Sequence, residues 1–150
     1  MGKNKIEKKP TGDRIAEVYL GRIFTKSSQD SARKRIHWML GCVQGSRVLD
    51  VGCSQGIASI LIAREGKVVV GLDPQFEAIR YAKKLADSES REVRDRIQWV
   101  VGDTWSYESD LGFDSVIVGE VIEHQASPLA FLRSVSKYVS NKGNIILTTP

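Results

Sequence analysis

Two glycines, Gly52 and Gly56, enclose three residues directly after the apolar run 47–51. This spacing predicts a tight turn between a strand and a helix, with the amides of residues 53–55 facing a ligand. Glycine suits both ends because a β-carbon would hold the ligand away from the backbone and restrict the positive φ values that the turn needs. The N-terminus of the following helix favours an anionic group, such as the carboxylate of a bound amino-acid moiety.

The spacing also indicates the kind of ligand. A dinucleotide site reads G-x-G-x-x-G and brings the backbone against a pyrophosphate, but Ser54 stands here where the middle glycine would be. The ligand is therefore expected to lack a pyrophosphate, which argues against NAD. Asp73 ends the second apolar run and suits both hydroxyls of a ribose. Asp103 follows the third run and can accept a hydrogen bond from an exocyclic amine such as that of adenine.

Glu120, Glu123 and His124 form a second group that could carry chemistry. On a helical turn these positions face together, and paired carboxylates repel unless one is protonated or a cation lies between them. Mg²⁺ would suit the carboxylate oxygens, with His124 as a nitrogen ligand. Alternatively, His124 acts as a general base, since it titrates near neutrality. A third interpretation gives Glu120 a cofactor contact and places Glu123 and His124 at the start of a loop.

Five segments, taken in their order, resemble the class I S-adenosylmethionine-dependent methyltransferases. They are VLDVGCSQG (48–56), VVVGLDP (68–74), VVGD (100–103), FDSVIVGEVIEH (113–124) and IILTTP (145–150). Glycine-rich turns are common, so one such segment would carry little weight, whereas five in the family's order are specific. The resemblance extends from about residue 47 to residue 150.

The resemblance implies a role for each candidate residue. Asp50, Gly52, Cys53 and Gly56 would line the methionine end of S-adenosylmethionine, Asp73 with Pro74 would hold the ribose, Asp103 with Thr104 would reach the adenine, and Glu120 would close the pocket. The EVIEH letters are similar to those of the ubiquinone-biosynthesis O-methyltransferases and the small-RNA 2′-O-methyltransferases, which use such residues around a metal. Glu120, Glu123 and His124 are therefore candidate metal ligands, and Glu123 and His124 are candidate catalytic residues. The RNA enzymes need a further downstream histidine, and none follows His124.

Strands and helices that alternate must position these residues. Strands are expected at 47–51, 67–72, 97–101, 113–118 and 144–149, and helices at 13–20, 30–40, 57–65, from Pro74 onward and at 128–139, with residues 88–96 as a fraying helix end and loop. Asp73 can cap the helix that Pro74 begins. This order predicts an α/β fold, a Rossmann-like doubly wound parallel sheet of order 3-2-1-4-5.

Composition and domain organisation restrict the remaining choices. We expect a basic disordered tail at 1–12, N-terminal helices at 13–46 and a cofactor-binding domain at 47–150. The family's sheet has seven strands and this chain supplies five, so the domain is expected to be incomplete at its C-terminus, with further sequence in the parent protein. No apolar stretch reaches the length of a membrane span. Two cysteines without CxxC spacing fit a reducing, cytoplasmic setting.

These observations favour methyl transfer from S-adenosylmethionine to a hydroxyl or amine of a small molecule, by in-line displacement. The donor is already activated, so no covalent nucleophile is needed and rate comes from positioning. One alternative is an RNA 2′-O-methyltransferase, which the EVIEH letters and the basic tail favour and the missing downstream histidine disfavours. Another is a non-catalytic cofactor-binding fragment of a larger protein.

Overall fold

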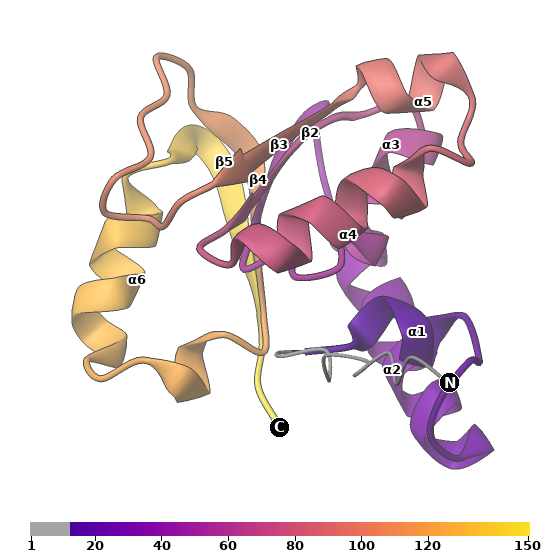
Figure 1. Cartoon of the computed structure of the whole chain (residues 1–150). Coiled ribbons are helices and arrows are strands. Elements are labelled where there is room, and N and C mark those ends of the chain that lie inside the picture. The colour runs from indigo at the N-terminus through magenta and orange to yellow at the C-terminus, as the bar shows by residue number, and fades with distance from the viewer. Residues whose placement is uncertain (1–12) are drawn as a thin grey trace, which may run out of the picture.

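A five-stranded parallel sheet forms the centre of the computed structural model, which describes residues 13–150 (Figure 1). The strand order is β3-β2-β1-β4-β5, which confirms the predicted doubly wound fold. The strands are β1 (Arg47–Val51), β2 (Val68–Asp73), β3 (Ile97–Val101), β4 (Phe113–Gly119) and β5 (Val139–Thr148). The predicted tail at 1–12 lies outside the described residues.

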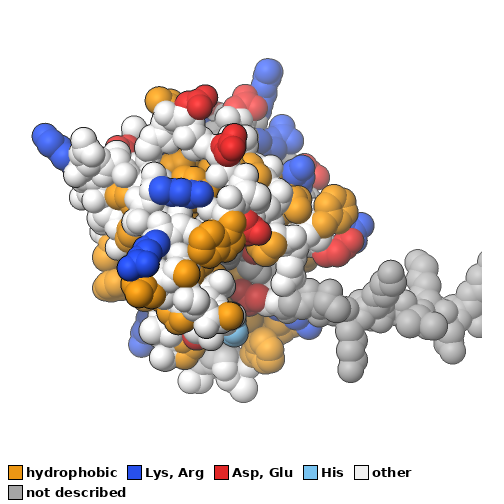
Figure 2. Space-filling view, turned by 90° about the vertical axis from the view of Figure 1, so that its left-hand side faces the viewer, with side chains coloured by type: hydrophobic (Ala, Val, Ile, Leu, Met, Phe, Trp, Pro, Cys, Tyr) orange, Lys and Arg blue, Asp and Glu red, His pale blue; other side chains and the backbone are white. Residues whose placement is uncertain are grey.

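Helices cover both faces of this sheet, as right-handed crossovers between parallel strands require. They are α1 (Ile15–Tyr19), α2 (Lys26–Gly41), α3 (Ile57–Arg64), α4 (Phe76–Ala86), α5 (Arg91–Asp95), the 3₁₀ helix η1 (Ile122–His124) and α6 (Pro128–Ser136). In Figure 1, α6 lies on one side of the sheet and α1 to α4 lie on the other. Figure 2 views the α6 side, where basic side chains are scattered among hydrophobic ones and form no single patch.

Several predicted boundaries differ from those of the structure; the helix predicted at 128–139, for example, ends at Ser136. Three other differences have a visible structural cause. The second helix begins at Lys26 rather than at residue 30, since the Thr25 side chain accepts a hydrogen bond from the Ser28 amide. The stretch expected to fray contains α5, which Ser90 caps in the same way. The last strand begins at Val139 rather than at residue 144, because its pairing with β4 is irregular there. Val139 pairs with Phe113 and Asn144 pairs with Ser115, so five residues of β5 advance along only two of β4.

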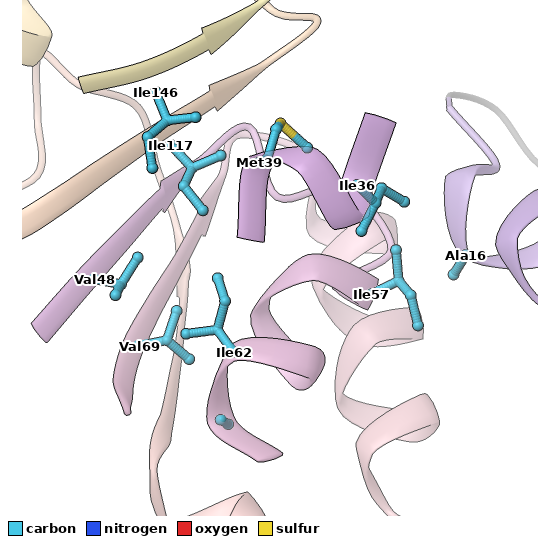
Figure 3. Close-up of a cluster of buried hydrophobic side chains, with 10 residues drawn as sticks. Ala16, Ile36, Met39, Val48, Ile57, Ile62, Val69, Ile117 and Ile146 are labelled. Carbon is cyan, nitrogen blue, oxygen red and sulfur yellow. The ribbon is translucent and has the colours of Figure 1, made fainter. Parts of the chain in front are cut away.

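Alternate residues of the strands feed two separate cores, because successive side chains point to opposite faces of a sheet. Toward α1, α2 and α3 the strands direct Val48, Val69, Ile117 and Ile146 (Figure 3). Toward α6 they direct Leu49, Val70 and Val116, which pack with Phe131 and Val135. Within residues 13–150, no helix combines the length and the apolar character that a membrane crossing needs.

The Trp99 side chain of β3 packs against Gly56 and Gly71, so neither glycine needs the close approach of a ligand to account for it. Trp99 pairs in register with Gly71 of β2, and a β-carbon on Gly71 would lie 2.8 Å from its ring. A β-carbon on Gly56, at the start of α3, would lie 2.5 Å from the same ring. Gly56 also has a φ of +81°, so its conformation and its neighbour both exclude a side chain. The sequence predicted glycine at position 56 to admit a ligand, and packing against Trp99 is a second reason why glycine is required there.

Gly56→Ala should therefore destabilise the fold by about 2–5 kcal/mol, because a left-handed conformation costs about 1–2 kcal/mol and an overpacked core about 1–3 kcal/mol. Gly66→Ala is the matched control, since Gly66 lies just after α3 with a φ of +87° and no atom near its missing β-carbon. The control should cost only the backbone part, about 1 kcal/mol. Urea unfolding measures both, and equal losses would contradict the packing role of Trp99.

Candidate functional site

A hollow opens at the carboxyl ends of β1 and β4, where doubly wound sheets bind their ligands. The loop after β1, the start of α1, one side of α2 and the end of β4 form its walls. Its lining residues are Asp13, Ile15, Arg35, Ile36, Met39, Asp50, Gly52, Cys53, Ser54, Ile57, Ala58, Ile117, Gly119 and Glu120. Asp50, Gly52, Cys53 and Glu120 had been predicted from the sequence, whereas Asp13 and Arg35 had not.

The carboxylate of Asp73 is held at the end of β2 by two backbone amides. Ser54 donates to Oδ2 at 2.9 Å, and Gln75 donates to Oδ1 at 2.8 Å. Each oxygen keeps a further lone pair for a ligand hydroxyl. Asp73 does not cap α4 and Pro74 does not begin it, because this helix starts at Phe76 with Gln75 as its N-cap. The bond to Gln75 fixes the loop ahead of the helix instead.

The turn after β1 uses its amides internally, contrary to the prediction that they face a ligand. Gly52 and Cys53 both donate to the carbonyl of Leu72, at 2.8 and 3.1 Å, and Gly56 donates to the carbonyl of Cys53 at 2.8 Å. The amide of Ser54 is committed to the β2 carboxylate. Positive φ values of +68° at Gly52 and +48° at Ser54 turn the chain toward β2. The amides of Cys53 and Ser54, two of the three predicted to face a ligand, are therefore engaged within the protein.

Asp50 places a buried carboxyl at the floor of the site. Its side chain accepts a hydrogen bond from the hydroxyl of Ser59 at 2.7 Å. Burial raises the pKa of Asp50 to about 6; the Ser59 bond opposes this rise, and the charge of Asp73 adds to it. Asp50 therefore titrates just below neutral pH.

Gln55 is a residue whose role the sequence did not reveal. Its Oε1 accepts hydrogen bonds from the amides of Ala16 and Glu17, at 3.0 and 3.3 Å. These amides belong to the first turn of α1, where helix N–H groups lack internal partners. The N-cap residue of α1, Arg14, makes no side-chain capping bond, so Gln55 caps the helix from a distant loop. This cap, with a bond from the Ser54 hydroxyl to the carbonyl of Asp13, holds α1 against the hollow.

Arg35 and Glu120 form an ion pair across the hollow, with Nη1 and Oε1 2.8 Å apart. Arg35 comes from α2, and Glu120 follows β4 with a φ of +54°. Both side chains are about one-third exposed, at 29% and 30%. Arg35 is the one cationic side chain among the described residues that line the hollow. Nothing in the local sequence distinguishes it from its basic neighbours, Arg33 and Lys34.

The predicted metal ligands do not converge. Glu120 lies in the left-handed region ahead of η1, so the helical spacing that would align it with Glu123 and His124 is absent. Its carboxylate pairs with Arg35, while the Glu123 carboxylate lies 4.0 Å from Nε2 of His124. Across residues 13–150, no group of three or more acidic, histidine or cysteine side chains is placed to hold a metal ion. The side chains present therefore do not fit the expected Mg²⁺ ion.

Asp103 and Thr104 make local contacts at the end of β3. Oδ1 of Asp103 accepts hydrogen bonds from the amides of Trp105 and Ser106, both at 2.9 Å. These bonds, led by that from Ser106, lower the pKa of Asp103. The Thr104 side chain is buried, and its hydroxyl lies 2.6 Å from that of Ser134 in α6. The Thr104 hydroxyl is thus directed at α6, and its carbonyl accepts a hydrogen bond from the Tyr138 hydroxyl at 2.9 Å, so both groups are engaged away from the predicted adenine contact.

The fold and the acidic residues at its strand ends define a nucleoside-binding domain of the Rossmann-like class. A family described as "Methyltransferase domain" matches residues 24–150. The chain therefore belongs to this family, within the class I S-adenosylmethionine-dependent methyltransferases. The resemblance expected from the five sequence segments is confirmed.

Relatives with curated names support this assignment. The chain is 34% identical over 108 residues to the mitochondrial ubiquinone biosynthesis O-methyltransferase of Schizosaccharomyces pombe, which covers 72% of this chain and 39% of that protein. It is 34% identical over 105 residues to the ubiquinone biosynthesis O-methyltransferase of Xanthomonas campestris pv. campestris strain B100, covering 70% and 43%. The chain thus spans less than half the length of these two relatives.

Solved structures share the fold at lower identity. The glycopeptide N-methyltransferase MtfA complexed with S-adenosyl-L-methionine aligns with a TM-score of 0.67 and 19% identity, over 75% of this chain and 47% of that one. Magnesium protoporphyrin IX methyltransferase from Synechocystis PCC 6803 aligns with a TM-score of 0.68 and 19% identity, over 87% and 67%. At this identity the comparison shows the fold alone.

Asp50→Asn should become more stable than the parent chain as the pH rises from about 4 to about 7. The folded-state pKa of about 6 exceeds the ordinary value of 3.8, so the parent is stabilised at low pH and loses that stability as Asp50 ionises. A shift of this size corresponds to about 3 kcal/mol at neutral pH. Urea unfolding of both chains across this pH range measures the difference.

Asp114→Asn provides a control of opposite sign. The amides of Arg47 and Ser46 lower the pKa of Asp114, so its contribution is present above the ordinary pKa and is lost as the pH falls. The parent should therefore exceed this variant in stability most clearly at neutral pH. An Asp50→Asn difference that does not change with pH would contradict the buried titration.

Gln55→Ala should destabilise the fold by about 1–2 kcal/mol, because a helix loses its cap. Amide hydrogen exchange of Ala16 and Glu17 should accelerate, since these groups lose their acceptor. Gln44→Ala is the control: Gln44 donates to the carbonyl of Lys142 at an exposed site, and its loss should cost about 0.5 kcal/mol or less. Unchanged exchange at Ala16 in Gln55→Ala would refute the distant cap.

Proposed function

We propose that this domain binds S-adenosylmethionine and transfers its methyl group to a hydroxyl of a small molecule. The carboxylate of Asp73 carries the proposal, because two amides fix it at the end of β2 with acceptor capacity left for a ribose diol. Ser54, whose amide holds that carboxylate, also lines the hollow together with Gly52. Asp103 and Thr104 follow β3 and would form the adenine side of the same edge.

The reaction proposed is an in-line displacement. An oxygen of the acceptor attacks the methyl carbon, the carbon–sulfur bond breaks, its electron pair remains on sulfur, and the hydroxyl proton passes to a base. The sulfonium supplies an activated methyl group, so the protein contributes alignment and exclusion of water. Ile36, Met39 and Ile57 give the hollow apolar walls suited to that exclusion.

His124 is the proposed base, with Glu123 as its charged neighbour. Nε2 of His124 and Oε1 of Glu123 lie 4.0 Å apart. The His124 side chain is 77% exposed on η1, just beyond the end of β4, which leaves it free to meet an acceptor from solution. Because the metal ligands do not converge, the proposed reaction contains no metal-dependent step.

The relatives favour a phenolic acceptor of the quinone-precursor type, since the two similar proteins above are named for ubiquinone biosynthesis. An RNA acceptor would require cations for phosphate contacts around the site. Among the described lining residues Arg35 alone is cationic, and it is already paired with Glu120. The charge distribution therefore favours a small molecule over RNA.

S-Adenosylhomocysteine at about a hundred times its dissociation constant should stabilise the fold by about 2.7 kcal/mol. Asp73→Ala should abolish most of that gain, measured as the shift in melting temperature of each chain relative to its own ligand-free form. Asp114→Ala is a matched control, because Asp114 also accepts from two backbone amides but lies at the opposite end of the strands. It should lower the melting temperature and keep the ligand shift.

A parent chain that shows no ligand shift would refute cofactor binding. Incorporation of labelled methyl groups into a simple catechol tests the second half of the proposal. Cofactor binding without transfer, by this chain and by the full-length protein, would instead support the non-catalytic alternative.

A further inference from the structure

A buried tyrosine outside the hollow fixes the loop that connects β3 to β4. Tyr138 lies between α6 and β5. Its hydroxyl donates to the carbonyl of Thr104 at 2.9 Å and to that of Tyr107 at 2.6 Å, so one proton is shared between two acceptors. In Figure 1 this loop lies on the same side of the sheet as α6. Tyr138 therefore connects the loop to the end of that helix.

A second set of hydroxyl groups joins the same loop to α6. Oγ of Ser134 donates to the carbonyl of Phe131 at 2.6 Å, and the Thr104 hydroxyl lies 2.6 Å from Oγ. Because the Ser134 proton is already used, the Thr104 hydroxyl is the donor of the second bond. Thr104 and Ser134 are both buried. Hydrogen bonds are electrostatically stronger where water is excluded, so these bonds hold the loop firmly.

The turn that these bonds hold, at residues 103–107, begins at Asp103. The Tyr107 amide closes it on the Asp103 carbonyl at 3.0 Å, and the Gly102 amide, just before it, donates to the carbonyl of Asp73 at 3.0 Å. The bond from Gly102 thus sets the spacing between the strand ends that carry Asp73 and Asp103. The hydroxyl bonds from the α6 side restrain the same turn from its buried side.

Asp103 carries the group that this arrangement orients. Its Oδ1 accepts bonds from the Trp105 amide and from the amide and hydroxyl of Ser106, at 2.9, 2.9 and 3.0 Å. Among the contacts of the described residues, Oδ2 is left as an acceptor for a ligand. Asp103 is exposed although Thr104, its neighbour in the chain, is buried. The bonds to one oxygen therefore fix the carboxylate and leave the other oxygen for the base of the cofactor.

We propose that Tyr138 is a positioning residue that makes the site select a base with an exocyclic amine. This inference rests on the proposed function, since it concerns the adenine of S-adenosylmethionine. A fixed carboxylate accepts a bond from the 6-amino group of adenine but repels the 6-oxo group of hypoxanthine. A mobile carboxylate would instead shift to the N1–H of hypoxanthine and bind either base. Selection therefore depends on the groups that hold Asp103 in place, and Tyr138 acts through the loop backbone without contacting the cofactor.

Two probes separate this inference from the proposed function. S-Adenosylhomocysteine carries adenine, and S-inosylhomocysteine carries hypoxanthine on the same ribose and amino-acid end. Calorimetric titration of the parent chain should show about ten- to a hundredfold tighter binding of S-adenosylhomocysteine, as expected for a hydrogen bond to a charged group. If neither probe binds, the proposed function fails and the inference falls with it. If both bind with equal affinity, the inference alone is overturned.

Substitutions then test the part played by Tyr138. Tyr138→Phe should reduce the ratio of the two affinities about three- to tenfold, mainly by weakening S-adenosylhomocysteine. Asp103→Ala should bring the ratio close to one, since the discriminating carboxylate is gone. Adding Tyr138→Phe to Asp103→Ala should leave the ratio unchanged, because the tyrosine acts through that carboxylate.

Ser115→Ala is the matched control. Ser115 is also a buried hydroxyl that joins separate segments, since it accepts from the Gln44 amide at 2.9 Å and donates to Oδ1 of Asn144 at 2.7 Å. It lies near the amino end of β4, away from the ligand edge. This variant should lower the melting temperature and keep the parent ratio.

Two outcomes of the variants overturn the inference. A parent-like ratio in Tyr138→Phe, with both probes weakened equally or neither affected, would mean that the tyrosine only stabilises the fold. A further fall of the ratio in the double variant would mean that Tyr138 acts independently of Asp103. Ser134→Ala, which removes the acceptor of the Thr104 hydroxyl, takes the place of Tyr138→Phe in these comparisons if the phenylalanine variant does not fold.

Discussion

The contact between the turn after β1 and the end of β2 determines the geometry of the whole site. Gly52 and Cys53 bind the carbonyl of Leu72, and Ser54 binds the carboxylate of Asp73. Left-handed conformations at the two ends of the turn make these contacts possible, and Trp99 packs against one of them. The same bonds that orient the β2 carboxylate remove amides from the hollow.

The N-terminal helices depend on this turn as well. Gln55 caps α1 through its side chain, and α1 then packs on α2, so that Asp13 and Arg35 become walls of the hollow. The sheet alone supplies only the acidic side of the site. Its cationic side comes from α2, which lies outside the alternating strands and helices of the fold. The ion pair across the hollow therefore depends on the N-terminal helices being docked against the turn.

The sequence allowed the sheet and its acidic strand ends to be predicted because both depend on local patterns. Apolar runs identify buried parallel strands, and a carboxylate directly after such a run must lie at the ligand edge, as Asp50, Asp73 and Glu120 do. Arg35 and Gln55 could not be predicted, because their partners lie far away in the chain. The predicted metal group failed for a conformational reason: helical spacing was assumed for Glu120, whose backbone is left-handed. Thr25 and Ser90 are residue types that often cap helices. Without a periodic pattern of apolar residues directly after them, their identity alone did not allow the starts of α2 and α5 to be predicted.

The balance of charge in the hollow bears on how a methyl donor is distinguished from its product. Asp13, Asp50 and Glu120 face a single guanidinium, so negative charge is in excess at neutral pH. Loss of a methyl group converts a cationic sulfonium into a neutral thioether, while the amino-acid and nucleoside ends stay the same. An acidic hollow favours the cation over the neutral form, because opposite charges attract most strongly where water is partly excluded. The burial that raises the pKa of Asp50 to about 6 limits this excess, since a second fully ionised carboxylate beside Asp73 costs stability. The fold thus keeps a destabilising buried acid in the lining of the hollow, where it accepts a hydrogen bond from Ser59.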